Sequence, residues 1–445
     1  MMSISSSKKF DIVIVGGGPA GSYFANLMSG EGFDVALIEQ KKYPNFWDKI
    51  CGSVAGKTFL KNVNVEESRV VKNEFSSFSV RDFQGEKLSE VYVDLIVIDR
   101  IEAGKEILEE ARDNGVKIVD NKIVRELIMD SKGVRGVGFE GRVGEGGKIF
   151  SRLVVDASGT DGILREKLKH KLPETEFVQD DLVMAYMEKI KLDKSPYTYE
   201  DLQLFISKEN APGGYAWITP VGEEVISGIG AMLSLTSRAT LIENLAKVKN
   251  MEGIRGNIEL SGIGVLPVRR PFSSFVYNGF ALIGDSGSQG NPFFGGGIEG
   301  AIEAAKIAFR TLKKGLEVSE NKVVSIEDLW IYNYEFMTKR GVLLAMIDLL
   351  RMVAQSLNDK ELQTIAKNMP KSLQFDLLTL LSIGMKLSGL LFRPRFLWKT
   401  VELVKVSQKV KEMYLRYPKE PEELEDWIKK VEKVYKKFKK SISKM

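Results

Sequence analysis

Short apolar runs alternate with amphipathic stretches through the first part of the chain. Residues 10–15 (FDIVIV) and 35–39 (VALIE) have the length and β-branched content of buried parallel strands. The segment between them, SYFANLMSGEG, is typical of a helix closed by glycine. Together these segments predict a β-α-β unit. A further amphipathic helix is expected over residues 104–114, and residues 124–140 alternate around a Ser-Lys-Gly turn, which indicates an antiparallel meander.

The pattern changes at about Phe177. From there to Leu266 the chain contains alternating stretches that suit an antiparallel sheet with one face in water, namely LVMAYMEKIKL, LQLFIS, YAWITP and EVISGIGAML. GFALIGDSG then returns to a buried strand, and GIEGAIEAAKIAFRTLKKG predicts a long helix. From about Ile326 the pattern is helical, and one apolar face is formed by Leu403, Val406, Val410 and Met413.

These patterns predict an α/β fold with an antiparallel component. We expect a discontinuous Rossmann-like domain over residues 1–175 and 267–325, an inserted antiparallel β-sheet substrate domain over residues 176–266, and a helical C-terminal region over residues 326–445. The 445 residues, of which 44% are hydrophobic and 28% charged, are enough for two or three domains with ordinary cores.

The chain has one cysteine, Cys51, and one histidine, His170. An intramolecular disulfide is therefore excluded, and a four-ligand zinc site or a cysteine-ligated iron–sulfur cluster is not expected. His170 lies among charged residues in LREKLKHKLP, which favours a solvated side chain over a catalytic one. Metal and Ser-His-Asp chemistry are accordingly not expected.

The formal charge of +4 is concentrated near the end of the chain, in WIKKVEKVYKKFKKSISKM. Such a segment is usually a solvated helix face, and attraction to an anionic membrane is the alternative. Nucleic acid is not an expected partner, because no recognisable nucleic-acid module accompanies the lysines. The polar opening MMSISSSKK does not predict a signal peptide, and the apolar residues 373–392 are interrupted by Asp376 and Lys386, which makes a poor membrane span. We expect a cytoplasmic protein that can touch a membrane peripherally without crossing it.

A glycine motif lies directly between the first predicted strand and helix. Gly16, Gly18 and Gly21 form G-x-G-x-x-G, with Ala20 in the same turn. Glycine is needed there because the turn is tight and the backbone must approach a pyrophosphate closely, with helix N–H groups aimed at the anion. Glu39, at the end of the next strand, is placed to receive ribose hydroxyls. This spacing predicts a dinucleotide site, although the motif alone does not distinguish NAD from FAD.

A second glycine-rich site favours FAD. Asp285 ends a buried strand and could accept hydrogen bonds from a ribityl chain. Gly295, Gly296 and Gly297 precede a long helix and offer N–H donors to the electron-rich edge of a flavin ring. Arg100, at the start of a predicted helix, could brace the cofactor or could be a surface arginine.

Several motifs now form a recognisable set. GGGPAG with Glu39, IDR at 98–100, VVDASG at 154–159, IGDSG at 283–287 and NPFFGGG at 291–297 resemble the flavoprotein fold shared by aromatic hydroxylases and geranylgeranyl reductases. KICGS resembles the cysteine-glycine segment that the reductases place beside the flavin, and PGGYAWITP resembles their P-x-x-Y-x-W-x-F-P signature. VLPVRRP and YLRYP are similar to the archaeal branch.

The resemblance implies an FAD-binding, aromatic-hydroxylase-type fold and an enzyme that saturates isoprenoid chains of membrane lipids by hydride transfer from reduced flavin. It implies a catalytic role for Cys51 and Gly52 at the flavin face, where Cys51 orients the alkene or relays a proton. Without the resemblance, a lone cysteine is more often a packed hydrophobe.

The resemblance also implies a substrate tunnel, which is expected to be formed by Tyr215, Trp217, Phe293 and Phe294. Without it, alternating aromatic residues on a strand would be expected to fill a core. The chain departs from the pattern at two positions. Thr219 replaces the phenylalanine of the signature, and Ser53 stands where an acidic residue is common. Thr219 is expected beside the tunnel, where a smaller or more polar residue could change the chain length or the class of the substrate, so the exact substrate stays open.

Two alternatives stay open at this stage. The first is a flavin-dependent hydroxylase that uses oxygen and NADPH. The second is an electron-transfer or lipid-binding flavoprotein with no chemistry of its own on the lipid. YAWITP is also similar to the W-x-W-x-I-P of flavin-dependent halogenases, but Tyr215 replaces the first tryptophan. Because the chain lacks cluster-ligating cysteines, an external electron donor, such as ferredoxin or NAD(P)H, is expected.

Overall fold

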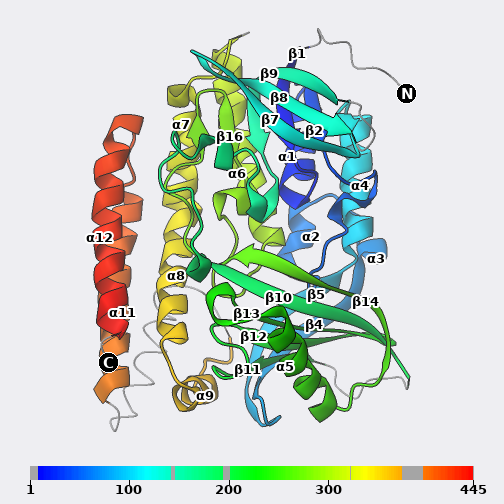
Figure 1. Cartoon of the computed structure of the whole chain (residues 1–445), viewed down its shortest axis with the longest axis vertical. Helices are drawn as coiled ribbons and strands as arrows, with labels where there is room; N and C mark the ends of the chain where they lie inside the picture. The colour runs from blue at the N-terminus through cyan, green and yellow to red at the C-terminus, as the bar shows by residue number, and fades with distance from the viewer. Residues whose placement is uncertain (1–8, 142–145, 194–200, 321, 373–393, 444–445) are drawn as a thin grey trace.

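The computed structural model describes residues 9–141, 146–193, 201–320, 322–372 and 394–443. Two β-sheets lie one above the other in Figure 1, and helices flank both of them. The C-terminal helices form a separate layer along one side of the molecule.

Within the described residues, the first sheet has eight strands. They are β1 (Lys9–Val15), β2 (Val35–Ile38), β6 (Lys117–Val119), β7 (Lys122–Asp130), β8 (Gly133–Gly141), β9 (Gly146–Asp156), β15 (Val276–Tyr277) and β16 (Phe280–Leu282). Its parallel part has the order β16-β9-β1-β2-β6, and β7 and β8 continue from β9 as an antiparallel meander. Ile12, Val13 and Ile14 are fully buried, as expected for a strand covered on both faces.

Helices cover the parallel strands. Helix α1 (Pro19–Gly30) lies between α4 (Arg100–Asp113) and α6 (Ile298–Val318) in Figure 1 and contacts both. Because α1 follows β1 and α6 follows β16, both helices begin at the carboxyl end of the parallel sheet, where ligands of such sheets bind. The short helices α2 (Thr58–Asn62) and α3 (Glu67–Val70) contact α6 and α4, respectively.

The second sheet also has eight strands among the described residues. In spatial order they are β14 (Gly256–Pro267), β10 (Leu182–Leu192), β13 (Glu224–Met232), β12 (Tyr215–Val221), β11 (Leu202–Ile206), β4 (Val71–Asp82), β5 (Lys87–Ile98) and β3 (Val54–Gly56). Strands β3, β4 and β5 therefore pair with the predicted substrate domain, although the prediction assigned residues 54–98 to the first domain. No local pattern predicts this pairing, because β4 and β11 are more than a hundred residues apart in the sequence.

One face of the second sheet is covered by helix α5 (Arg238–Met251) and the other lines a cavity. Along β12, Ala216 and Ile218 are fully buried in the core cluster that includes α5, whereas Tyr215 and Trp217 face the cavity. The alternation of a strand thus places the two aromatic side chains of the signature on the cavity face.

The C-terminal region is helical, as predicted. It contains α7 (Ile326–Phe336), a π-helical turn (Met337–Gly341), α8 (Val342–Gln355), α9 (Asp359–Lys367), α11 (Pro394–Leu415) and α12 (Leu424–Ser443). The predicted apolar face of α11 is confirmed, since Leu403, Val406 and Val410 are buried.

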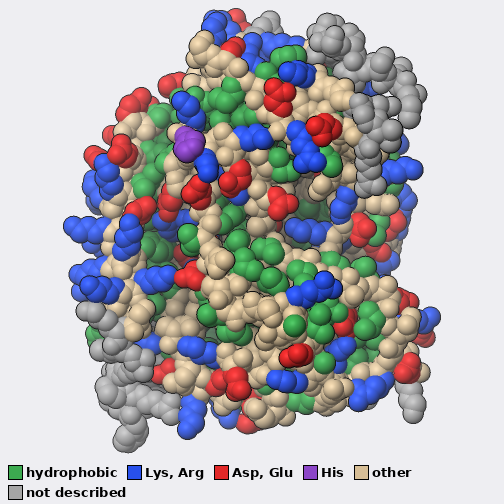
Figure 2. Space-filling view, viewed as in Figure 1, with side chains coloured by type: hydrophobic (Ala, Val, Ile, Leu, Met, Phe, Trp, Pro, Cys, Tyr) green, Lys and Arg blue, Asp and Glu red, His purple; other side chains and the backbone are tan. Residues whose placement is uncertain are grey.

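Two further predictions concern the exposure of His170 and the apolar stretch 373–392. His170 is exposed, as predicted, and is the purple side chain in Figure 2. Within the ranges described above, no helix is both long and apolar enough to span a bilayer. The apolar stretch 373–392, with Asp376 and Lys386, lies outside those ranges.

Candidate functional site

The first glycine motif forms a tight turn between β1 and α1. Gly16 has a φ of +103°, and a Cβ there would collide with the carbonyl group of Ala157. A Cβ at Gly21 would collide with the carbonyl oxygen of Gly16, so this glycine lets the helix pack closely on the turn. Around Gly18 no atom lies within 4 Å of an added Cβ, and no side chain caps the helix. The N–H groups that begin α1 are therefore open to an anionic ligand.

Glu39 is fixed beside this turn. Its carboxylate accepts hydrogen bonds from the backbone N–H groups of Gly17 (2.7 Å) and Lys41 (2.9 Å). The side chain is buried but also lines the cavity. Glu39 thus occupies the position at the end of β2 that the sequence predicted for a ribose ligand.

The second glycine segment forms a loop that opens at the start of α6. The Asn291 side-chain oxygen accepts hydrogen bonds from the backbone N–H groups of Phe293 (2.9 Å) and Phe294 (3.2 Å). Gly295 has a φ of +65° and lies against Leu266, so a larger residue would be strained there. Gly297 precedes α6 without any side-chain cap. A second helix N-terminus therefore offers unused N–H donors to the same cavity.

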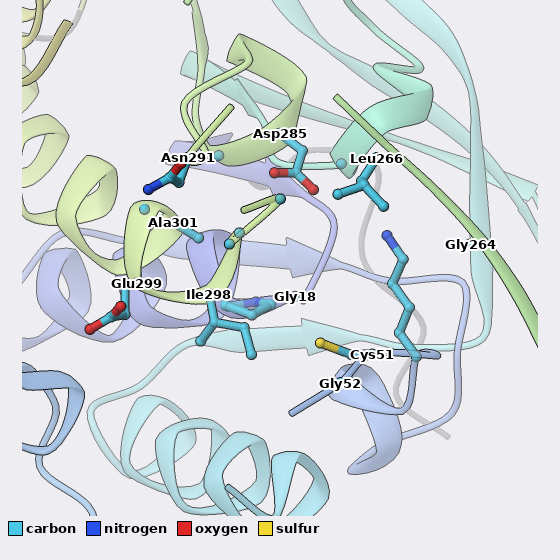
Figure 3. A pocket seen from close by; sticks show the side chains of 18 of the residues that line it. Gly18, Cys51, Gly52, Gly264, Leu266, Asp285, Asn291, Ile298, Glu299 and Ala301 are labelled. Carbon is cyan, nitrogen blue, oxygen red and sulfur yellow. The ribbon is translucent and has the colours of Figure 1, made fainter. Parts of the chain in front are cut away.

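A single cavity of 1190 Å³ joins both glycine segments to the second sheet. Figure 3 shows Gly18, Asp285, Leu266, Ile298 and Cys51 converging on it from different elements. All but one of the residues predicted from the sequence to form the site line it: Gly16, Gly18, Ala20, Glu39, Cys51, Gly52, Arg100, Tyr215, Trp217, Asp285, Phe293, Phe294, Gly295, Gly296 and Gly297. The exception is Gly21, which does not line the cavity but lets α1 pack closely on the turn at Gly16.

Asp285 and Arg100 supply charge at the centre of the cavity. Burial raises the pKa of Asp285, and the positive charges of Lys49 and Arg100 act in the opposite direction. No hydrogen bond to the Asp285 carboxyl group is found among the described residues, which leaves its oxygens available to a ligand. Arg100 donates a 2.9 Å hydrogen bond to the carbonyl oxygen of Lys49, so it braces the loop before Cys51. Arg100 is partly exposed and also lines the cavity, so its contact with the cofactor stays a prediction.

Cys51 and Gly52 lie where this loop meets β12. A Cβ at Gly52 would be 3.3 Å from the indole Nε1 of Trp217, so glycine permits this close packing. The indole N–H is buried and has no hydrogen-bond partner among the described residues. The Cys51 thiol accepts a long hydrogen bond (3.4 Å) from the backbone N–H of Ser53 and is partly exposed to the cavity. Cys51 is therefore not simply packed in a core.

Tyr215 connects the second sheet to the second glycine segment. Its hydroxyl group donates a 2.7 Å hydrogen bond to the carbonyl oxygen of Phe294. Its ring meets Trp217 edge-on, with 6.0 Å between the ring centres, and Phe293 meets Phe294 in the same way at 5.2 Å. Burial raises the pKa of the Tyr215 phenol, and nearby Cys51 adds to the effect. The four predicted aromatic residues thus form one wall.

The expectation for Thr219 is wrong. Its side chain is fully buried and does not line the cavity, and its hydroxyl group has no partner among the described residues. The sequence analysis also missed Lys49, Asn291, Leu266 and Arg351, which line the cavity. Asn291 and Leu266 lie within quoted motifs, but nothing in the pattern marked their side chains, because their roles depend on loops folded back from distant elements.

The residues present fit a flavin dinucleotide. Two helix N-termini without side-chain caps and the carboxyl groups of Glu39 and Asp285 line the cavity. Arg100 lines it too, and its Nε has no hydrogen-bond partner among the described residues. A dinucleotide needs donors for its phosphates and acceptors for its ribose or ribityl hydroxyls, and this set provides both.

Comparisons with known proteins agree with this geometry. Residues 14–47 match the model of an NAD(P)-binding Rossmann-like domain. Digeranylgeranylglycerophospholipid reductase of Sulfolobus acidocaldarius is 28% identical over 427 residues, which cover 92% of this chain and 94% of the relative. Digeranylgeranylglycerophospholipid reductase 1 of Methanococcoides burtonii is 25% identical, with coverage of 80% and 87%.

Solved structures share the fold. A geranylgeranyl bacteriochlorophyll reductase-like protein of Thermoplasma acidophilum has a TM-score of 0.77 at 19% identity, covering 89% of this chain and 99% of that one. A variant of a flavin-dependent brominase has a TM-score of 0.63 at 16% identity, with coverage of 92% and 100%. The predicted fold class is confirmed. Over most of its length, the chain is similar to digeranylgeranylglycerophospholipid reductases.

Proposed function

We propose that the protein is an FAD-dependent oxidoreductase that saturates carbon–carbon double bonds in the geranylgeranyl chains of membrane lipids or their precursors. The observation that carries this proposal is the single cavity, which joins a dinucleotide cradle to an apolar wall with Cys51 at the junction. The similarity to the reductases over most of the chain supports the same substrate class.

The cofactor would be held by residues of the first sheet. The N-terminus of α1 receives the pyrophosphate, Glu39 binds ribose hydroxyls, and Asp285 binds the ribityl chain. The N-terminus of α6, after Gly297, stabilises negative charge at the edge of the ring. When bound and reduced, FAD supplies the hydride for alkene reduction.

The substrate chain would lie against the second sheet. The cavity face of that sheet is apolar and includes Phe78, Leu95, Ala185, Met187, Leu204 and Trp217. At about 0.8 kcal/mol for each buried CH₂, a geranylgeranyl chain can be bound by apolar burial alone. The apolar wall also keeps water from the reacting carbons, so the substrate needs no polar group at the double bond.

Cys51 would orient the alkene or relay the proton that completes the reduction. Its thiol is the cavity-facing group beside Gly52 and Trp217. Electrons would come from an external donor such as ferredoxin or NAD(P)H, because one cysteine in the whole sequence cannot hold a cluster. Peripheral contact with a membrane is part of this proposal.

The decisive experiment follows the flavin and the lipid together. The purified holoenzyme is reduced chemically without oxygen and mixed with a digeranylgeranylglyceryl phospholipid dispersed in detergent. We expect the lipid to gain one hydrogen molecule per double bond, in step with flavin reoxidation. Flavin that stays reduced beside unchanged lipid would contradict the proposal, and rapid NADPH oxidation in air with an aromatic substrate would favour the hydroxylase instead.

A further inference from the structure

The outer surface of α12 is strongly basic. Exposed lysines cover the half of the helix that faces away from the core, and Figure 2 shows lysine and arginine side chains along the left edge, where α12 runs in Figure 1. They are Lys429, Lys430, Lys433, Lys436, Lys437, Lys439 and Lys440. Lys433, Lys436 and Lys440 are spaced at three and four residues, so they form one stripe along the helix.

Two exposed apolar side chains lie beside the end of this helix. Val178 is 60% exposed and Leu235 is 58% exposed, and each belongs to a short turn next to the second sheet. Asp180 joins the two turns to α12, because it accepts a 2.8 Å hydrogen bond from Ser234 and pairs with Lys439 at 3.1 Å. We call Val178, Leu235, Lys433, Lys436, Lys439 and Lys440 the basic-apolar patch.

Acidic groups offset only part of the charge of the patch. Asp180 pairs with Lys439 at 3.1 Å and Glu432 pairs with Lys436 at 2.9 Å. Lys433 and Lys440 form no ion pair among the described residues. Asp181 contacts Arg269 at 3.4 Å and Glu176 contacts Lys169 at 3.5 Å, so these two acidic groups are paired outside the patch. Arg238, directly after the turn that holds Leu235, is exposed and adds a further positive charge. The patch therefore combines a net positive field with exposed apolar groups.

The turns of the patch are continuous with strands that line the cavity. Val183 on β10 lines the cavity and lies three residues after Asp180, and Gly230 on β13 lines it five residues before Leu235. Arg351 of α8 also lines the cavity and is one of the charges that lower the pKa of Asp180. The segments that carry the two apolar side chains of the patch therefore also contribute to the cavity lining.

We propose that the basic-apolar patch docks the protein on an anionic lipid bilayer, with Val178 and Leu235 entering the interface and the lysines contacting lipid phosphates. This inference rests on the proposed function, since it names the surface from which the lipid substrate is collected. The apolar side of α12 is not available for insertion, because Trp427, Val431 and Phe438 are buried in the core. Docking therefore depends on the lysines and the two turns rather than on an inserted helix.

Charge and exposure together favour a bilayer over an acidic protein. A soluble acidic protein would bind through the lysines, but contact with the isolated side chains of Val178 and Leu235 would add little to its affinity. A bilayer uses both, because lysines near an anionic surface attract it and apolar side chains enter the boundary with the acyl region. Substitution of the apolar residues should therefore weaken binding to a bilayer but not to an acidic protein, whereas substitution of the lysines should weaken both.

The test measures co-sedimentation of the full-length holoenzyme with vesicles of equal parts phosphatidylglycerol and phosphatidylcholine, and with vesicles of phosphatidylcholine alone. We expect binding to the anionic vesicles that weakens with salt. Because each lysine near the surface contributes roughly fivefold, the variant K433E/K436E/K440E should bind about a hundredfold more weakly. V178S/L235S should bind about tenfold more weakly.

Matched controls separate the patch from overall charge. K132E/K314E/K360E changes the net charge equally at exposed positions on other elements, and Val318→Ser removes an apolar side chain that is 70% exposed. Both should bind like the wild type. If K132E/K314E/K360E lost as much vesicle binding as K433E/K436E/K440E, or if V178S/L235S bound like the wild type, the patch would not be the docking surface.

The same variants are assayed for reduction of the detergent-dispersed lipid, which needs no docking. The patch variants should reduce the dispersed lipid at the wild-type rate. Wild-type enzyme that reduces the dispersed lipid but does not bind the anionic vesicles would overturn the docking proposal and leave the proposed function standing. Vesicle binding without reduction of any dispersed lipid would support the docking surface and contradict the function.

Discussion

The phenol of Tyr215 donates a 2.7 Å hydrogen bond to the carbonyl oxygen of Phe294, and this bond ties strand β12 to the loop that opens α6. One partner belongs to the proposed substrate wall and the other to the proposed flavin site. This contact between a strand of the second sheet and the loop before α6 therefore helps to set the distance between substrate and cofactor.

Tyr215→Phe should affect turnover more than stability. Loss of one hydrogen bond costs about 1 kcal/mol of folding free energy, whereas a small shift of the loop would misplace the alkene from the hydride donor. We expect a slight fall in the melting temperature and at least a tenfold slower single-turnover reduction. Tyr92→Phe is the matched control, because Tyr92 is 50% exposed and does not line the cavity. Equal single-turnover rates for the two variants would show that the hydrogen bond between Tyr215 and Phe294 has no catalytic role.

Gly228 is expected to control the position of Trp217. The two residues are opposite each other on β13 and β12, and a Cβ at Gly228 would collide with the indole ring. Gly228→Ala should push the ring toward Gly52, change the tryptophan fluorescence and weaken binding of the lipid chain, and it should lower the free energy of unfolding by roughly 1–3 kcal/mol, the usual cost of overpacking. Gly30→Ala is the control, since an added Cβ there meets nothing closer than 3.6 Å. Unchanged fluorescence and affinity in Gly228→Ala would mean that the indole is not held by this contact.

Cys51→Ala should leave the cofactor bound and slow alkene reduction. The thiol lies beside Gly52 in the cavity, and its hydrogen bond among the described residues is with the backbone N–H of Ser53, not with either glycine segment that would hold the cofactor. We expect an unchanged flavin content and a rate lower by roughly a hundredfold, the lower end of the range for a positioned proton donor. Cys51→Ser keeps a donor at the same place and should recover part of the rate. A rate for Cys51→Ala equal to that of the wild type would contradict the proposed role.

The sequence predicted the parts of the site that depend on local backbone requirements. Gly16 and Gly295 must be glycine because of their positive φ angles, and Glu39 follows directly from the end of a strand. It could not predict that β3, β4 and β5 join the second sheet, because strand pairing over long separations leaves no local signal. The error for Thr219 has a similar origin, since alternation assigns a face of the strand but not where along that face the cavity ends.

The ionic cluster beneath α12 gives the protein a defined acid sensitivity. Glu174 contacts the side chains of Arg269, Arg270 and Ser273. Burial alone would raise the pKa of Glu174, but the two arginines and the hydrogen bonds lower it to about 2 from the usual 4.5. A carboxyl group whose folded-state pKa is lowered stabilises the fold above its unfolded pKa and loses that contribution as the pH falls through the folded value.

The stabilisation by Glu174 should therefore be complete above about pH 5.5 and should disappear between about pH 4.5 and pH 2. The shift corresponds to about 3 kcal/mol. Glu174→Gln should lose roughly 3–5 kcal/mol at neutral pH, because it leaves buried Arg270 without its charge partner. The difference from the wild type, measured by denaturant unfolding, should shrink as the pH falls through this window. Glu176→Gln, two residues away and mostly exposed, should change stability by less than about 0.5 kcal/mol at every pH. A pH-independent loss in Glu174→Gln would show that packing, rather than the charge of Glu174, holds α12 against the core.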